Sequence, residues 1–176
     1  MSFPAELVRD FVNTYDVESD TDELSSPAEL AVWLRERGLA GARDRATDDD
    51  LHTAHALREG IRAALRREPA ALPAFALPAL PLRVGVGRDG APELVPAADG
   101  VAGGLARIAA ATLGATWERL KVCAEGTCQW AFIDSSRNRS RSWCSMRVCG
   151  NRTKTRAYRA RKRGSRRLQA SNTDTV

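Results

Sequence analysis

The sequence lacks the features of several large classes of protein. No apolar run approaches the roughly 18 residues that a membrane-spanning helix needs. The first nine residues have neither the basic start nor the apolar stretch of a secretory signal peptide. There is also no Walker motif and no Ser, His and Asp combination of the kind that hydrolases use. We therefore expect a cytoplasmic protein with no membrane partner, and we do not expect an enzyme.

Charge is divided sharply along the chain, whose 176 residues suffice for one full core and a small module. Residues 1–118 contain 12 Lys and Arg against 19 Asp and Glu, a net charge of −7, whereas residues 119–176 contain 15 against 3, a net charge of +12. Such a division is typical of a protein in which one part meets a polyanion. It leads to the hypothesis that the acidic part docks on the basic part when no polyanion is bound.

Four segments of the acidic part have apolar residues at the spacing of an amphipathic helix. They are Leu7–Tyr15, Leu30–Leu34, Leu51–Leu65 and Leu105–Leu113. Two of these helices have recognisable starts. Ser26 and Glu29 form a capping box around Pro27, and Thr47 precedes three aspartates. Gly38 is expected to end the second helix.

One β-hairpin is predicted before the last of these helices. Segments 82–86 and 92–96 alternate apolar residues on either side of the turn dipeptide Asp89-Gly90. The acidic segment 16–23 is expected to be a solvated loop, and the Ala- and Pro-rich segment 69–81 a connector. The predicted fold class is therefore α+β, with a helical N-terminal domain that contains a β-hairpin.

All four cysteines lie in the basic part, in two pairs: Cys123 with Cys128, and Cys144 with Cys149. Disulfides are rare in a reducing cytoplasm, so metal ligands or reactive thiols are the alternatives. Four thiolates from two short knuckles complete a tetrahedral structural zinc site and leave no open position for a catalytic water. We expect one structural Zn²⁺ ion, with a redox thiol switch as the alternative.

The residues between the two cysteine pairs predict a small zinc-finger module. The apolar run 129–134 and the polar, basic turn 135–141 are typical of a hairpin, which we expect between two zinc knuckles. Trp130, Phe132 and Trp143 are expected to cover the metal. A module of this size cannot build enough core by itself, so the metal is expected to fold it.

A basic helix is predicted after the last cysteine. Arg152, Arg156, Arg159 and Arg163 fall on one side of it, at i, i+4, i+7 and i+11, and we call these four residues the arginine face. Like charges at this spacing destabilise an isolated helix, so an anionic partner is expected. Double-stranded DNA fits best, because Lys and Arg bind its phosphates with release of counterions.

Further residues are candidates for contact with nucleic acid. Asn151 is a candidate for a base edge. Lys154 on the basic helix and Arg139 and Arg141 in the basic turn are further candidates. Residues 164–176 are expected to form a disordered basic and polar tail. Two other functions would use the same residues: an RNA- or ribosome-associated module, or a redox sensor whose zinc thiolates oxidise and release the metal.

The basic part resembles a known family. Cys149-Gly150-Asn151-Arg152, with Trp143-Cys144-Ser145-Met146 before it and Lys154 after it, resembles the signature of the bacterial CGNR zinc-finger proteins. Phe11-Val12-Asn13-Thr14 and the segment 57–62 resemble the ABATE domain that precedes this finger. The resemblance implies a stress-induced transcription regulator. It also implies that the metal ligands are Cys123, Cys128, Cys144 and Cys149, and that the polar signature of the finger is Asn151, Arg152 and Lys154.

Three regions are predicted along the chain. Residues 1–118 form an ABATE-like domain for sensing or dimerisation, residues 119–163 the zinc finger with its basic helix, and residues 164–176 the tail. The resemblance implies that the first domain holds a small ligand. Asn13 and Thr14 are candidate pocket residues, with a helix cap as the alternative. A homodimer is a further expectation for this domain.

Overall fold

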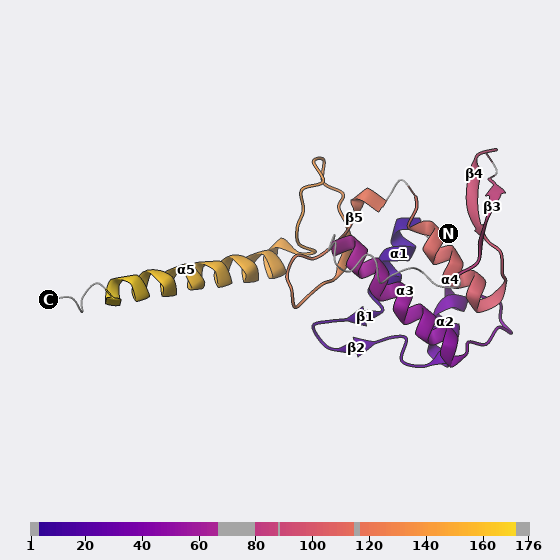
Figure 1. Cartoon of the computed structure of the whole chain (residues 1–176), viewed down its shortest axis with the longest axis horizontal. Coiled ribbons are helices and arrows are strands. Elements are labelled where there is room, and N and C mark those ends of the chain that lie inside the picture. The colour runs from indigo at the N-terminus through magenta and orange to yellow at the C-terminus, as the bar shows by residue number, and fades with distance from the viewer. Residues whose placement is uncertain (1–3, 67–79, 88, 115–116, 172–176) are drawn as a thin grey trace.

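The computed structural model describes residues 4–66, 80–87, 89–114 and 117–171. Most of the predicted connector, residues 69–79, lies outside these ranges. Figure 1 shows a body in which helices α1 (Pro4–Val12) to α4 (Gly100–Ala111) gather, with the hairpin of β3 (Leu82–Val86) and β4 (Pro92–Pro96) at one end. Helix α5 (Asn151–Ser171) projects from the opposite end of this body (Figure 1).

The body contains the four predicted helices: α1 (Pro4–Val12), α2 (Pro27–Glu36), α3 (Asp48–Arg66) and α4 (Gly100–Ala111). Both predicted helix starts are confirmed. The Ser26 hydroxyl accepts a hydrogen bond from the Glu29 N–H at 3.3 Å, and the Thr47 hydroxyl accepts one from the Asp50 N–H at 3.2 Å. Gly38 follows the end of α2 with φ at +67°, as a glycine stop predicts.

Two of the predicted helices are shorter than their apolar patterns. Helix α1 ends at Val12, and Tyr15 lies in a strand instead. Helix α4 ends at Ala111, so Leu113 lies beyond it and is 68% exposed rather than on the inner face. In both segments the apolar spacing continues beyond the last residue of the helix, so the spacing alone overestimates the length of the helix.

The strands form three antiparallel pairs among the described residues. They are β1 (Tyr15–Asp16) with β2 (Thr21–Asp22), β3 (Leu82–Val86) with β4 (Pro92–Pro96), and β5 (Leu120–Val122) with β6 (Ala131–Ile133). The predicted hairpin at 82–96 is confirmed. The first pair lies where a solvated loop is predicted, and it forms because Arg58 of α3 holds Asp22 of β2 with two hydrogen bonds, of 2.7 and 2.8 Å.

The close packing of α4 depends on glycine. A Cβ atom at Gly104 would come within 2.7 Å of the carbonyl oxygen of Leu39, and one at Gly103 would collide with the carbonyl of Ala98. Because both obstacles are backbone atoms, they cannot rotate away. Gly104 therefore lets α4 lie directly against the loop that follows α2, and Gly103 lets it lie against the segment between β4 (Pro92–Pro96) and α4.

One buried core joins the body to the predicted finger. Phe11, Leu34 and Ile108 of the body lie in the same cluster as Leu120 of β5 and Ala131 of β6. Alternation along β6 explains this packing, because Ala131 and Ile133 share one side of the strand while Phe132 takes the other. The finger's hairpin is thus part of the body's core.

Helix α5 spans Asn151–Ser171. Residues 164–171, predicted as part of a disordered tail, continue this helix, because the segment is rich in residues that favour helix, such as Arg, Leu and Ala. Residues 172–176 lie outside the described ranges. In the part of the chain that the structure describes, no helix has both the length and the apolar character to cross a membrane.

Candidate metal centre and nucleic-acid interface

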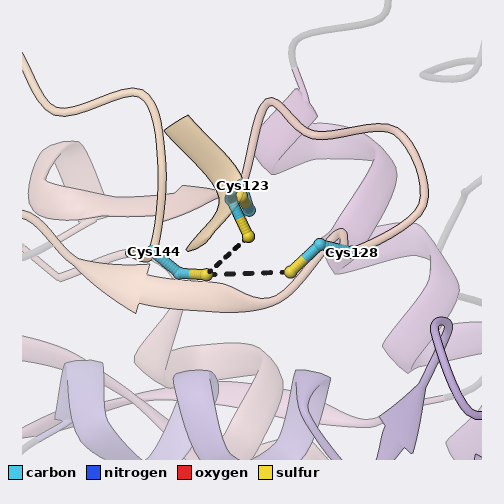
Figure 2. A group of neighbouring side chains, drawn as sticks. Cys123, Cys128 and Cys144 are labelled. Atoms are coloured by element: carbon cyan, nitrogen blue, oxygen red, sulfur yellow. Dashed lines mark hydrogen bonds between the residues drawn. The ribbon is translucent and has the colours of Figure 1, made fainter. Parts of the chain in front are cut away.

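The four cysteines come together at the junction of the body and α5. Cys123 and Cys128 lie in the connection between β5 and β6. Cys144 lies just before a π-helical turn, Met146–Gly150, that leads into α5, and Cys149 lies within this turn. Their sulfur atoms all lie within 4.8 Å of one another. Figure 2 shows Cys123, Cys128 and Cys144 with their sulfurs directed toward a common centre.

The sulfur spacing fits a tetrahedral zinc ion. Zn–S bonds of about 2.3 Å place neighbouring sulfurs of a tetrahedron about 3.8 Å apart. Cys144 Sγ lies 3.7 Å from both Cys128 Sγ and Cys149 Sγ, and all four cysteines are free thiols. The four residues can therefore hold one zinc ion. When bound, it would join the two knuckles into one folded unit.

The hairpin of the finger differs from its predicted place. The apolar run 129–134 supplies β6, whose partner is β5, so the first cysteine pair forms the connection within the hairpin. The hairpin was predicted between the two cysteine pairs. The difference arises because Leu120 and Val122, which precede the first cysteine pair, pack in the body's core. The sequence of the finger does not indicate this packing.

Of the three aromatic residues predicted to cover the metal, the structure packs Trp143 against the cysteines. Trp130 is 38% exposed, and the Phe132 ring lies under the Arg141 guanidinium at 5.0 Å. Gly150 makes room for this cover. A Cβ there would come within 2.5 Å of Met146 Sδ and 3.4 Å of the Trp143 ring.

A buried carboxylate organises the basic turn 135–141. Asp134 accepts hydrogen bonds from the Ser136 N–H at 2.9 Å, the Arg141 N–H at 3.0 Å and the Lys121 ammonium at 2.7 Å. The bond from Lys121, followed by those from Ser136, holds the pKa of this carboxyl well below its usual range. Asp134 therefore stays ionised and holds the turn in one conformation.

The predicted nucleic-acid residues fall into two groups. The arginine face and Asn151 line one side of α5, around a hollow of about 600 Å³. Arg139 and Arg141 lie in a separate hollow between the turn and α3, where Arg139 pairs with Glu118 and Arg141 donates to the Cys144 carbonyl at 2.8 Å. Lys154 lines neither hollow.

Two members of the arginine face are held by carboxylates. Arg152 pairs at 2.9 Å with Glu18, which belongs to the acidic segment of the body. Arg156 pairs at 3.0 Å with Glu125, which lies between the first two cysteines and is fully buried. A hydrogen bond from Thr153 and the contact with Arg156 lower the pKa of Glu125, although burial opposes this shift.

The structure places Asn13 and Thr14 in the interior. The Asn13 side chain forms two hydrogen bonds with the backbone of Ala131 in β6, of 2.9 and 2.7 Å. The Thr14 hydroxyl donates to the Phe11 carbonyl at 2.8 Å, as a cap of α1 would, and accepts from Arg58. The prediction of a ligand pocket at these two residues therefore has no support in this geometry.

Sequence reasoning missed several buried charged residues. Arg58 and Arg62 of α3 are each 4% exposed, and Arg62 donates to the carbonyls of Val12 and Tyr15. Glu125 and Asp134 are two of the three acidic residues among 119–176. Acidic residues are rare in this basic segment, and their rarity is a signal from which both could have been predicted as structural residues.

Comparison with known proteins agrees with these observations. The family model of the CGNR zinc finger matches residues 119–162. The ABATE family model, described as "Putative stress-induced transcription regulator", matches residues 5–125, more than half of the chain. Neither description is that of an enzyme, and no curated protein matches the chain. The chain belongs to the ABATE family of regulators and carries a CGNR zinc finger whose four cysteines can hold one zinc ion.

Proposed function

We propose that the protein regulates transcription in the cytoplasm by binding double-stranded DNA through α5. The observation that carries this proposal is the arginine face, which sets four guanidinium groups along one side of a helix that projects from the body (Figure 1). Such groups bind phosphates with release of counterions, and this supplies most of the affinity for a duplex. The description of the family as a transcription regulator supports the same proposal.

The two halves of α5 have different parts in this proposal. Arg159 and Arg163 are exposed and would bind phosphates directly. Arg152 would do so after exchange of Glu18, and Arg156, whose side chain is 60% exposed, would do so while it keeps its bond to Glu125. The Asn151 amide nitrogen donates one hydrogen to the Arg147 carbonyl at 3.0 Å, so its oxygen and its second N–H remain for a contact with a base edge.

The body, residues 1–118, would sense a small molecule or pair two protomers, and residues 119–163 would hold the DNA. Room for a small ligand lies between the loop after α2 and the start of α4, in a pocket of about 360 Å³. Asp44, Asp99 and Arg107 line this pocket and would recognise a polar molecule.

The test measures the affinity of the zinc-loaded protein for duplex DNA over a range of salt concentrations. Contact with about five phosphates gives a slope of log affinity against log salt of about −4.5. Replacing Arg159 and Arg163 together with Ala should reduce that slope by about 1.8. The matched control replaces Lys154 and Arg161, which lie on the other side of α5. Equal losses in both double variants would show that the arginine face has no special part.

The same assay separates the proposal from its two rivals. Structured RNA, added at equal salt, should compete more weakly than duplex DNA, and stronger competition would identify an RNA-binding module. Mild peroxide should leave DNA binding unchanged. Zinc release with reversible loss of binding would instead identify a redox sensor.

A further inference from the structure

Glu125 is an unusual residue for its surroundings. It lies between two cysteines of the metal centre, in a segment with a net charge of +12, and its side chain is fully buried. Glutamate is almost never buried without a partner, because removal of a carboxylate from water is costly. The protein must therefore compensate this charge through specific contacts.

The partners of Glu125 connect the first zinc knuckle to α5. One carboxylate oxygen accepts from the Thr153 hydroxyl at 2.9 Å, and the other pairs with Arg156 at 3.0 Å. The second oxygen also accepts from Thr127 at 3.1 Å, in the same knuckle as Glu125. Thr153 and Arg156 lie almost one turn apart on α5, so the carboxylate contacts the helix at two points along its axis.

Burial does not fix the direction of α5 between Lys154 and Arg163. Every side chain from Lys154 to Arg163 is exposed, so this stretch has no buried face to pack against the body. The helix spans 21 residues, which corresponds to a length of about 30 Å. A small change of angle at its base therefore displaces Arg159 and Arg163 by several times as much as it displaces Thr153.

We infer that Glu125 is a positioning residue: its bonds to Thr153 and Arg156 set the direction in which α5 leaves the metal centre. The consequence for DNA rests on the proposed function, whereas the consequence for the helix does not. With Glu125 in place, the four arginines approach a duplex as one preset array. Without Glu125, the direction of the helix varies about its first residues, and α5 takes a fixed direction only when it binds DNA.

The effect on DNA binding has an unusual sign. Removal of an acidic residue ordinarily strengthens binding to a polyanion, because the protein becomes more positive. Removal of Glu125 should weaken it, since the loss of positioning outweighs the gain of one charge. We expect a loss of affinity of about tenfold for Glu125→Ala. Glu36→Ala, which removes an exposed carboxylate at the end of α2, should leave affinity equal or slightly higher.

The direction of α5 can be measured without DNA. Residual dipolar couplings of the α5 amides report whether the helix shares the alignment of the body. In the zinc-loaded wild-type protein, one alignment tensor should fit both parts. In Glu125→Ala the couplings of residues 154–163 should shrink toward zero, while those of α3 and α4 stay unchanged. Glu125→Gln, which keeps an oxygen that accepts from Thr153, should retain about half of the wild-type couplings.

Thr153→Val provides a second variant, because valine keeps the shape of threonine and removes the hydroxyl. It leaves every carboxylate in place and should also reduce the α5 couplings. Zinc content, measured for every variant, shows whether the metal centre is intact. Unchanged couplings in zinc-loaded Glu125→Ala and Thr153→Val would overturn the inference. Reduced couplings in a protein that binds no DNA would uphold it and would refute the proposed function instead.

Discussion

Arg58 and Asp22 form an ion pair inside the body, where the Arg58 side chain is only 5% exposed. Burial opposes the charge on Asp22, but hydrogen bonds from Arg58 and from the Leu24 N–H outweigh it and lower the pKa of this carboxyl. Its pKa in the folded protein is therefore below the value of about 3.9 in the unfolded chain. The pair stabilises the fold above that value, and its contribution is lost as the pH falls through the folded-state pKa.

Asp22→Asn should accordingly lower the free energy of unfolding at pH 7 by about 2 kcal/mol, because a buried guanidinium loses one of its two charged partners and keeps Glu59. The difference from wild type should shrink below about pH 4, where Asp22 becomes protonated first in the unfolded chain and then, at lower pH, in the folded protein. Urea denaturation of both proteins across this range measures the effect, and loss of zinc in acid affects both alike. Asp10→Asn, which breaks a surface pair with Arg9, should change stability by at most about 0.5 kcal/mol.

Single residues were predictable where their partners are close in the chain. Ser26 and Thr47 cap helices whose bonded residues lie three positions away, so the sequence contains both members of each contact. The partner of Asn13 is 118 residues away in β6, and that of Arg58 is 36 residues away. No local pattern identifies such contacts, which is why a pocket or a cap was expected at Asn13.

Helix α4 contains a glycine that its packing against a neighbouring loop requires, although glycine is unfavourable within a helix. In an isolated helix, alanine is more favourable than glycine by about 1 kcal/mol. At Gly104 the added Cβ would meet the Leu39 carbonyl at 2.7 Å, so α4 would have to move away from the loop. Gly104→Ala should therefore destabilise the protein by about 2 kcal/mol.

Thermal or chemical denaturation of the full chain checks this expectation. Ala102→Gly, two residues earlier in α4, gives the reference for intrinsic preference and should cost about 1 kcal/mol. If Gly104→Ala is more stable than wild type, then the close approach of α4 to Leu39 is not a constraint.

The four helices of the body and the hairpin of β3 and β4 were predictable because amphipathic spacing and turn residues mark them directly, whereas the pair of β1 and β2 was not. The finger's hairpin was not, because Lys121 and its neighbours carry too short a pattern to reveal β5. The metal ligands were predictable from cysteine spacing alone. The carboxylates around them, Glu125 and Asp134, required the fold, since Glu125 binds Thr153 of α5 and Asp134 binds Lys121 of β5.

Ion pairs join the acidic part of the molecule to the basic part: Glu118 pairs with Arg139, and Glu18 pairs with Arg152. Glu18 of the acidic segment occupies Arg152, which a phosphate of DNA would otherwise approach. Deletion of the body would be a poor test of this contact, because it would also uncover the core side of β5 and β6. A point substitution leaves that core intact.

Glu18→Gln should strengthen binding to duplex DNA about threefold at low salt, which corresponds to the free energy of an exposed ion pair. Glu23→Gln is the matched control, since Glu23 is an exposed acid of the same segment. Fluorescence anisotropy measures both variants against wild type. An equal gain in the two would indicate a general effect of charge and would contradict a specific contact between Glu18 and Arg152.

The shared core has a consequence for how such chains recombine. A chimera joined at residue 118 would separate Asn13 from the strand that it binds and would remove the hydrophobic residues that pack around Leu120. A splice further along, between Cys128 and Cys144, would divide the metal ligands between two parents. The piece that can be exchanged cleanly is α5 itself, and any transplanted helix would need a hydroxyl at position 153 to meet Glu125.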